Sequence, residues 1–246
     1  MTQFDGASVL VTGGSRGIGK AIAMRFAELG AKQIGVGYMR NDTAAEQTAD
    51  DLRGLGAEPL LIRGNVTSER VLAEVENHGP WNVVVHNAAT GVIRPALETE
   101  DKHWDWTLGA NARAFLSLTR AAAPQMPKGS SIVGISSLGA IRVLENYVLV
   151  GTSKAALESL VRYLAVELAP RGIRVNAVSG GVVETGALEH FPNKDEMLAT
   201  AKKRTPAGRL VLPSDIAGAV VFICSDDADM VRGQTLIVDG GFSLLA

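Results

Sequence analysis

Residues 7–30 read ASVLVTGGSRGIGKAIAMRFAELG, and this stretch decides how the rest of the chain folds. Its first six residues are an apolar run with β-branched side chains, the pattern of a buried strand. A turn with glycines at 13, 14, 17 and 19 follows, and a helical pattern then runs to Gly30. In such a unit the helix-start N–H groups and the helix dipole attract phosphate. The stretch predicts an α/β nucleotide-binding fold, although turns that only pack closely share its G-x3-G-x-G spacing.

Further apolar runs and helical patterns alternate along the chain. The expected strands are residues 33–38, 58–63, 81–86, 131–136, 173–178 and 235–238. The expected helices are residues 43–55, 68–78, 98–126, 146–169 and 213–224, the first opened by a capping box that starts at Thr43. This alternation predicts right-handed crossovers and a parallel sheet. No linker or repeat divides residues 1–246, so one domain is expected, with residues 186–212 as a substrate lid.

The composition argues against several classes of protein. A formal net charge of -2 without a basic block disfavours binding to nucleic acid or to anionic membranes. No apolar run approaches 18 residues, no signal peptide is visible, and the single cysteine, Cys224, excludes an internal disulfide. The four histidines lack metal-ligand spacing. We therefore expect a cytoplasmic protein without a metal site.

Residues 136–156, SSLGAIRVLENYVLVGTSKAA, hold the candidate catalytic side chains Ser137, Tyr147 and Lys154. Tyr147 and Lys154 are seven residues apart, so a helix that begins near Asn146 would place both on one face. A phenol is a weak acid, and a neighbouring cation makes it a better hydrogen-bond donor to developing negative charge. The three side chains are those needed to polarise a carbonyl beside a reduced nicotinamide. The competing interpretation is a buried tyrosine and a snorkelling lysine without a catalytic role.

Other candidate positions suit a dinucleotide. Arg16 lies in the glycine turn, and Arg40 follows the second strand, where an acidic residue would select a ribose 2′-hydroxyl. Two guanidinium groups there favour the 2′-phosphate of NADPH, whereas the adjacent Asp42 keeps open the alternative that both arginines are only solvated. Asn65 and Val66 follow the third strand, where a side chain could contact adenine.

These motifs together resemble the short-chain dehydrogenase/reductase family. The resemblance covers nearly the whole chain, and its motifs keep the order of the family. They are Thr12-Gly-x3-Gly-Ile-Gly19, Asn87-Ala-Ala89, Asn111, Ser137, Lys154 with Ala155-Ala156, Asn176 and Val238-Asp-Gly-Gly241. The resemblance implies a doubly wound, seven-stranded parallel sheet of the Rossmann type with helices on both faces. It also implies hydride transfer with NAD(P)H.

One departure from the family pattern narrows the resemblance. The family usually carries Tyr-x3-Lys, but Val150 occupies that tyrosine position here and Tyr147 lies three residues earlier. The resulting Tyr-x6-Lys is similar to that of the enoyl-acyl-carrier-protein reductases, and segments such as GVIRPALE and HWDWT resemble the NADPH-dependent enoyl reductase III type. Two further departures are His86 in place of the family's first asparagine and Gly180-Gly181 in place of Pro-Gly.

The resemblance implies NADPH-dependent reduction of trans-2-enoyl thioesters on acyl carrier protein, by a homotetramer. Tyr147 would polarise the thioester carbonyl, Lys154 would bind the nicotinamide ribose, and Ser137 and Asn111 would support them. The residues expected around the cofactor are Gly13, Ser15, Arg16, Gly17, Ile18, Gly19, Arg40, Asn65, Val66, Asn87, Ala88, Lys154, Gly181, Val183 and Thr185. Two alternatives stay open: a ketoreductase acting on 3-oxoacyl thioesters or small carbonyls, and a non-catalytic NADP-binding module.

Overall fold

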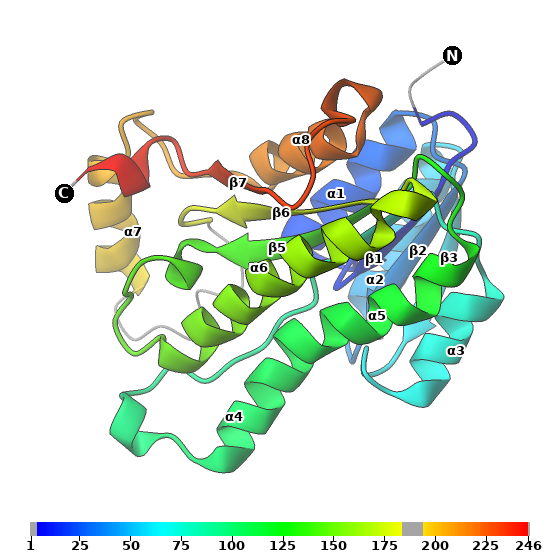
Figure 1. Ribbon diagram of the computed structural model, residues 1–246. Coiled ribbons are helices and arrows are strands. Elements are labelled where there is room, and N and C mark those ends of the chain that lie inside the picture. The colour runs from blue at the N-terminus through cyan, green and yellow to red at the C-terminus, as the bar shows by residue number, and fades with distance from the viewer. Residues whose placement is uncertain (1–3, 184–193, 246) are drawn as a thin grey trace.

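The centre of the molecule is a seven-stranded sheet with the strand order β3-β2-β1-β4-β5-β6-β7 (Figure 1). The computed structural model describes residues 4–183 and 194–245. The strands are β1 (Ser8–Thr12), β2 (Gln33–Tyr38), β3 (Glu58–Arg63), β4 (Val83–His86), β5 (Ser131–Ser137), β6 (Arg174–Gly180) and β7 (Thr235–Val238). Every neighbouring pair is parallel. The predicted doubly wound, Rossmann-type fold is confirmed.

Each predicted strand is present, and its ends differ from the prediction by at most two residues. The apolar runs form strands because both faces of the sheet are covered, so side chains on both sides are removed from water. All four residues of β4 are buried, as are four of the five residues of β1.

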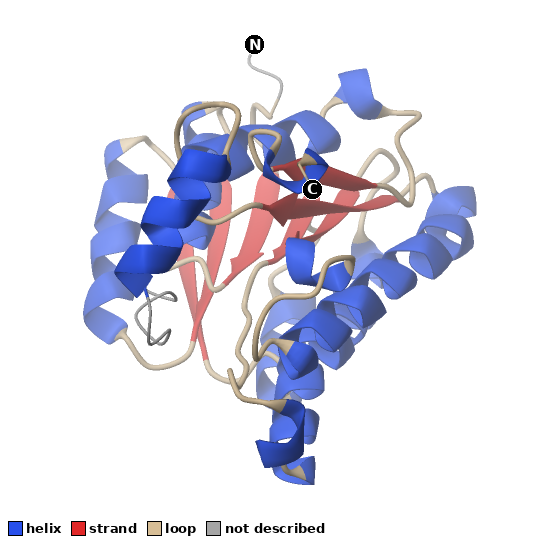
Figure 2. Ribbon diagram, turned by 90° about the vertical axis from the view of Figure 1, so that its left-hand side faces the viewer, coloured by secondary structure: helices blue, strands red, loops and turns tan. Residues whose placement is uncertain are grey.

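Helices cover both faces of the sheet (Figures 1 and 2). One layer contains α1 (Gly17–Glu28), α2 (Asp42–Gly54) and α8 (Pro213–Cys224), and the other contains α3 (Glu69–Asn77), α5 (Ala114–Ala122) and α6 (Val148–Leu168). Phe26 and Val220 belong to the hydrophobic core on the first face. Phe115 and Leu157 belong to the core on the second. The apolar stripes of the helices thus account for both cores.

Two helix predictions on either side of β3 and β4 are wrong in detail. The helix expected over residues 98–126 is divided into α4 (Asp101–Leu108), a π-helical turn (Gly109–Arg113) and α5, with short 3₁₀ turns at Ala96–Glu98 and Ala123–Gln125. The helix expected from Thr43 begins instead at Asp42, because the side chain of Asn41 caps it by accepting a hydrogen bond from the Ala44 N–H at 3.0 Å. Asn41, two residues before Thr43, therefore caps the helix in place of the expected capping box.

The predicted lid region contains helix α7 (Lys194–Arg204), which stands at the carboxyl edge of the sheet, where β5 and β6 end (Figure 1). Residues 186–193 lie outside the described residues, so the lid itself stays a prediction. Within the described part of the chain, no helix combines the length and the apolar character needed to cross a membrane.

A buried histidine joins β1, β4 and the π-helical turn. His86 ends β4, with Nδ1 3.1 Å from the Thr12 hydroxyl and Nε2 3.2 Å from the Asn111 carbonyl oxygen. The Thr12 hydroxyl oxygen already accepts from the backbone N–H groups of Asn87 and Ala88, so its own hydrogen points to Nδ1. Nε2 therefore carries the imidazole proton and donates it to Asn111. The contacts require a neutral imidazole in a single tautomer.

Asn111 continues this chain of hydrogen bonds to helix α6. Its side-chain amide donates to the Ser153 hydroxyl at 2.8 Å and to the Thr90 carbonyl at 2.9 Å, and its side-chain oxygen accepts from the Thr90 N–H at 3.0 Å. Ser153 in turn donates to the Val150 carbonyl at 2.7 Å. The π-helical turn adds one residue to the helix and so positions Asn111 for its bonds to Thr90 and Ser153. This turn is the break in the predicted long helix.

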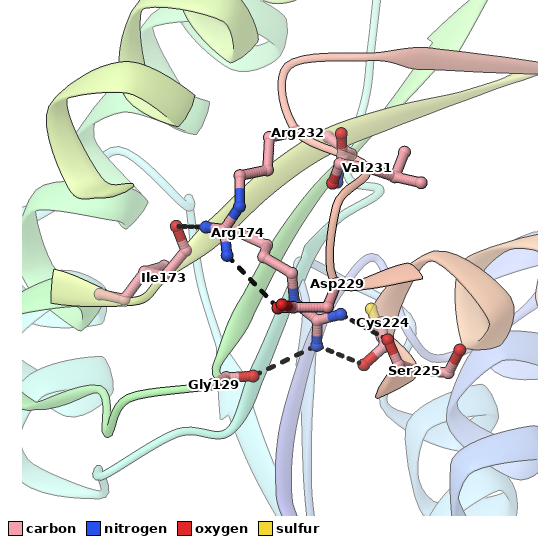
Figure 3. A network of polar contacts seen from close by, with 9 residues as sticks. Gly129, Ile173, Arg174, Cys224, Ser225, Asp229, Val231 and Arg232 are labelled. Carbon is pink, nitrogen blue, oxygen red and sulfur yellow. Dashed lines mark hydrogen bonds and ion pairs between the residues drawn. The ribbon is translucent and has the colours of Figure 1, made fainter. Parts of the chain in front are cut away.

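A second buried anchor lies at the amino ends of the strands, and Figure 3 shows its contacts. Arg174, the first residue of β6, is only 2% exposed. Its guanidinium donates to the carbonyls of Cys224 at 2.9 Å and Gly129 at 3.3 Å, and to that of Ser225. Cys224 and Ser225 form the carboxyl end of α8, where the helix dipole is negative, so the helix end stabilises the buried charge. Arg174 thereby joins β6 to α8.

His86 is expected to make the fold less stable in acid. Burial, and then the charge of Lys154, lower its pKa from 6.5 to about 3. Between these pH values the unfolded chain binds a proton that the folded chain does not, so this part of the stability is complete above pH 6.5 and falls as the pH approaches 3. From about pH 7.5 to about pH 5 the loss should be about 2 kcal/mol.

Urea unfolding of the wild type and of His86→Gln at these two pH values measures this loss. The glutamine side chain keeps a donor for the Asn111 carbonyl but has no proton to gain, so the variant should lose about 2 kcal/mol less than the wild type between them. Equal losses in the two proteins would show that His86 does not titrate in this way.

Arg174→Met is expected to lower the free energy of unfolding by about 3 kcal/mol, because the buried carbonyls of Cys224 and Ser225 and the partly buried carbonyl of Gly129 lose their donor. The matched control is Arg232→Met. Arg232, also drawn in Figure 3, has a side chain that is 30% exposed and pairs with Asp229 at 3.3 Å, so its loss should cost less than about 1 kcal/mol. Urea unfolding curves compare the two variants. Similar losses for both would contradict the role given to Arg174.

Candidate functional site

A crevice of about 1000 Å³ follows the carboxyl ends of the strands. The loops that leave β1 to β6 line it, as expected for the ligand site of a doubly wound sheet. The predicted site residues that line the crevice are Gly13, Ser15, Arg16, Gly17, Ile18, Arg40, Asn65, Val66, Asn87, Ala88, Ser137, Tyr147, Lys154, Gly181 and Val183. Gly19 and Asn111 are buried and do not line it, and Thr185 lies outside the described residues.

The glycine turn after β1 fits a pyrophosphate. Gly13 has φ of 65°, and a Cβ there would lie 2.9 Å from the Asn87 side-chain nitrogen. A Cβ at Gly19 would lie 2.1 Å from the Gly13 carbonyl oxygen, so α1 begins directly against the turn. The first turn of α1 contains no acidic residue, and no side chain caps it. Its N–H groups therefore remain available to an anion.

Guanidinium groups lie at the end of the crevice where the sequence predicts the ribose. Arg16 and Arg40 both line the crevice with exposed side chains. Asp42, which argued for solvated arginines at the sequence level, pairs with Arg63 at 3.4 Å. Burial, and then a hydrogen bond to Asp42, raise the pKa of Tyr38. Arg63 ends β3 and was not anticipated, because only the pairing of β2 with β3 brings it beside Tyr38.

Tyr147 is placed by the turn that precedes α6. The expected helix start at Asn146 is wrong: α6 begins at Val148, and Tyr147 is its N-cap residue. Asn146 has φ of 58°, a conformation that asparagine tolerates, and its carbonyl accepts a hydrogen bond from the Arg94 N–H at 2.9 Å. The Tyr147 hydroxyl lies 3.5 Å from the Ser137 hydroxyl. Burial raises the pKa of Tyr147, against the opposing effect of Ser137, so the phenol keeps its proton at neutral pH.

Lys154 reaches the crevice from the second turn of α6. It is 5% exposed, and its ammonium donates to the Ile135 carbonyl at 2.7 Å. Burial lowers its pKa to about 8, while Glu158 opposes this shift. Glu158, also buried, accepts a hydrogen bond from the Ser136 hydroxyl at 2.6 Å. Glu158 was not among the predicted site residues, although its spacing of four residues from Lys154 places the two on the same face of a helix.

The crevice thus contains a protonated phenol, a neighbouring hydroxyl and a buried ammonium group. Such a set can donate hydrogen bonds to an oxygen on which negative charge develops. Asn111 has its side chain and its carbonyl engaged by Thr90, Ser153 and His86, so it holds the crevice wall in place. The catalytic roles assigned to these residues remain predictions.

Known proteins resemble this chain over almost its whole length. A family model described as Enoyl-(Acyl carrier protein) reductase matches residues 13–243. The chain is 36% identical over 244 residues to 1-cyclohexenylcarbonyl-CoA reductase of Streptomyces collinus. The aligned region covers 96% of this chain and 87% of that protein. This relative acts, by its name, on a thioester of coenzyme A.

Two solved structures show the same fold with nicotinamide cofactors. A blue fluorescent protein from a metagenomic library, in complex with NADPH, has a TM-score of 0.89 and 31% identity and covers 98% of this chain and 99% of its own. A 7α-hydroxysteroid dehydrogenase complexed with NADH and 7-oxo glycochenodeoxycholic acid has a TM-score of 0.89 and 33% identity and covers 97% and 95%. With its motifs, its sheet order and these similarities, the chain belongs to the short-chain dehydrogenase/reductase family of NAD(P)-dependent oxidoreductases.

Proposed function

We propose that this protein reduces trans-2-enoyl thioesters with NADPH, the acyl group being carried by acyl carrier protein. The observation that supports this function best is the place of the phenol. Tyr147 precedes α6 and lies beside Ser137, whereas Val150, at the usual tyrosine position, is buried. Of the two tyrosines among the described residues that line the crevice, Tyr38 and Tyr147, Tyr147 is the one directly before the helix that carries Lys154.

The residues suit a conjugate reduction. When bound, NADPH would supply a hydride for the β-carbon of the substrate. Negative charge would then develop on the thioester oxygen, and the Tyr147 hydroxyl would donate a hydrogen bond to it. This interaction strengthens as the charge grows, so it stabilises the transition state more than the bound substrate. Lys154 would hold the nicotinamide ribose and add a positive field, and Ser137 would orient the phenol.

One similar protein and the matching family model support an unsaturated thioester as the substrate. The name of the Streptomyces collinus relative describes a thioester whose carbonyl is bonded to a ring carbon of a C=C double bond. The matching family model is described as an enoyl reductase. The exposed Lys202 and Lys203, in the last turn of α7, would attract an acidic carrier protein at the carboxyl edge of the sheet.

Assembly into a homotetramer is part of the same proposal. Trp104 and Trp106 on α4 are 46% and 54% exposed, and Tyr163 and Val166 on α6 are 68% and 75% exposed. Large apolar side chains on neighbouring helices are typical of a subunit interface.

Tyr147→Phe is expected to lower kcat for NADPH-dependent reduction of crotonyl thioester by about 100-fold, because the charge-stabilising donor is lost. NADPH binding should stay within about twofold, since the ring remains. NADPH absorbance measures turnover, and Tyr163→Phe, with its exposed ring, is the matched control.

If folded Tyr147→Phe retains more than about a tenth of the wild-type rate, the proposed role of Tyr147 as the hydrogen-bond donor to the thioester oxygen is wrong. The wild type itself discriminates between functions in the same assay. Faster turnover of a 3-oxoacyl thioester than of the enoyl thioester would identify a ketoreductase. NADPH binding without turnover of either would identify a non-catalytic module.

Arg40→Glu is expected to raise KM for NADPH by about tenfold or more and to leave KM for NADH within about twofold, because only NADPH carries the 2′-phosphate. The matched control is Arg53→Glu, an exposed arginine on α2 that does not line the crevice. Initial rates with each cofactor measure the change. Equal effects on both cofactors would contradict NADPH selection by Arg40.

A further inference from the structure

The ring of Tyr147 lies directly on the backbone of Gly139. Gly139 belongs to the 3₁₀ turn Leu138–Ala140 that follows β5. A Cβ at this position would lie 2.5 Å from Cε1 and 2.6 Å from Cδ1 of the tyrosine ring. Protein atoms do not approach so closely, so any side chain at 139 would displace either the ring or the turn.

The turn itself has little room to move. It also touches α6, where a Cβ at Gly151 would lie 2.7 Å from the Gly139 carbonyl oxygen. The Gly139 N–H donates to the Ser137 hydroxyl at 3.2 Å, the same hydroxyl that lies near the Tyr147 phenol. The backbone of residue 139 is thus held by Ser137 and α6, and the tyrosine ring is the neighbour that can shift.

Val150 occupies the position of the family's usual tyrosine, and its side chain packs closely against Gly91. Val150 lies one helical turn after Tyr147, and a Cβ at Gly91 would lie 2.2 Å from its Cγ2. Val150 therefore packs against the loop that follows β4. The first turn of α6 depends on two glycines, one that admits the phenol at 147 and one that admits the valine at 150.

We propose that Gly139 is a specificity-determining position of this enzyme. Its missing side chain lets the Tyr147 ring rest on the turn after β5, and this sets how far along the crevice the phenol lies. In conjugate reduction the oxygen that gains charge lies two atoms farther from the hydride-accepting carbon than it does in ketone reduction. Gly139 thereby favours a thioester oxygen over a ketone oxygen, a conclusion that rests on the function proposed above.

A double-mutant cycle tests this proposal. Gly139→Ala should lower kcat with crotonyl thioester by about tenfold or more, because the ring must move by about 1 Å, and should lower the ratio of enoyl to 3-oxoacyl turnover. In a Tyr147→Phe background the same substitution should change kcat by less than about twofold, since no hydroxyl remains to be misplaced. NADPH binding should not change in either background. The matched control is Gly218→Ala on α8, where a Cβ would meet no atom within 4 Å.

Equal losses in both backgrounds would overturn the proposal, because they would show that Gly139 acts on folding or on the crevice in general. An unchanged kcat in folded Gly139→Ala would overturn it as well. A crystal structure of Gly139→Ala gives a readout apart from activity: a displaced Tyr147 ring supports the proposal, and a ring in its original place excludes it.

The wild type separates this proposal from the function on which it rests. A wild type that reduces only 3-oxoacyl thioesters, or neither substrate, overturns the proposed function and the selectivity of Gly139 together. A wild type that reduces enoyl thioesters, combined with an additive cycle, overturns the role of Gly139 alone.

Discussion

The reversal of strand order between β1 and β4 is the constraint on which the site depends. The chain builds β1, β2 and β3 in one direction and then returns to place β4 beside β1. The loops that leave β1 and β4 consequently diverge at the carboxyl edge and open a crevice between them. The His86 imidazole and the Thr12 hydroxyl join these two strands directly below that opening. The nucleotide site is thus a consequence of the sheet topology, with a buried hydrogen bond to hold it.

Four buried polar residues beside the crevice form one chain of hydrogen bonds. Each donor from Thr12 through His86 and Asn111 to Ser153 has an acceptor, so none carries the cost of an unpaired buried group. The ammonium of Lys154 follows the same rule, with the Ile135 carbonyl as its acceptor and the carboxylate of Glu158 on the next helical turn. Such a system keeps the site rigid before any ligand binds, which is the condition for electrostatic stabilisation of a transition state.

The chemistry proposed for this family member differs from that of its relatives through packing rather than through new functional groups. A phenol, a hydroxyl and an ammonium group suffice for either carbonyl or conjugate reduction, and their relative positions decide which oxygen they reach. Here the position of the phenol depends on glycines, which leave space because they have no side chain. The backbone at Gly139 and Gly91 leaves room for Tyr147 and Val150 at the start of α6, and Asn146 supplies the left-handed turn before them.

The sequence by itself determined the strands, their parallel pairing, the glycine turn and the family, because apolar periodicity, glycine spacing and motif order are local properties of the chain. Most residues of the crevice were also predictable, since they follow strands whose carboxyl ends meet at one edge. Only the tertiary structure decided the rest. The break at Asn111, the tautomer of His86, the partnership of Glu158 with Ser136 and the engagement of Asp42 by Arg63 all join residues 20 or more positions apart. These residues come into contact only after the sheet has formed, so no local sequence pattern predicts the contacts.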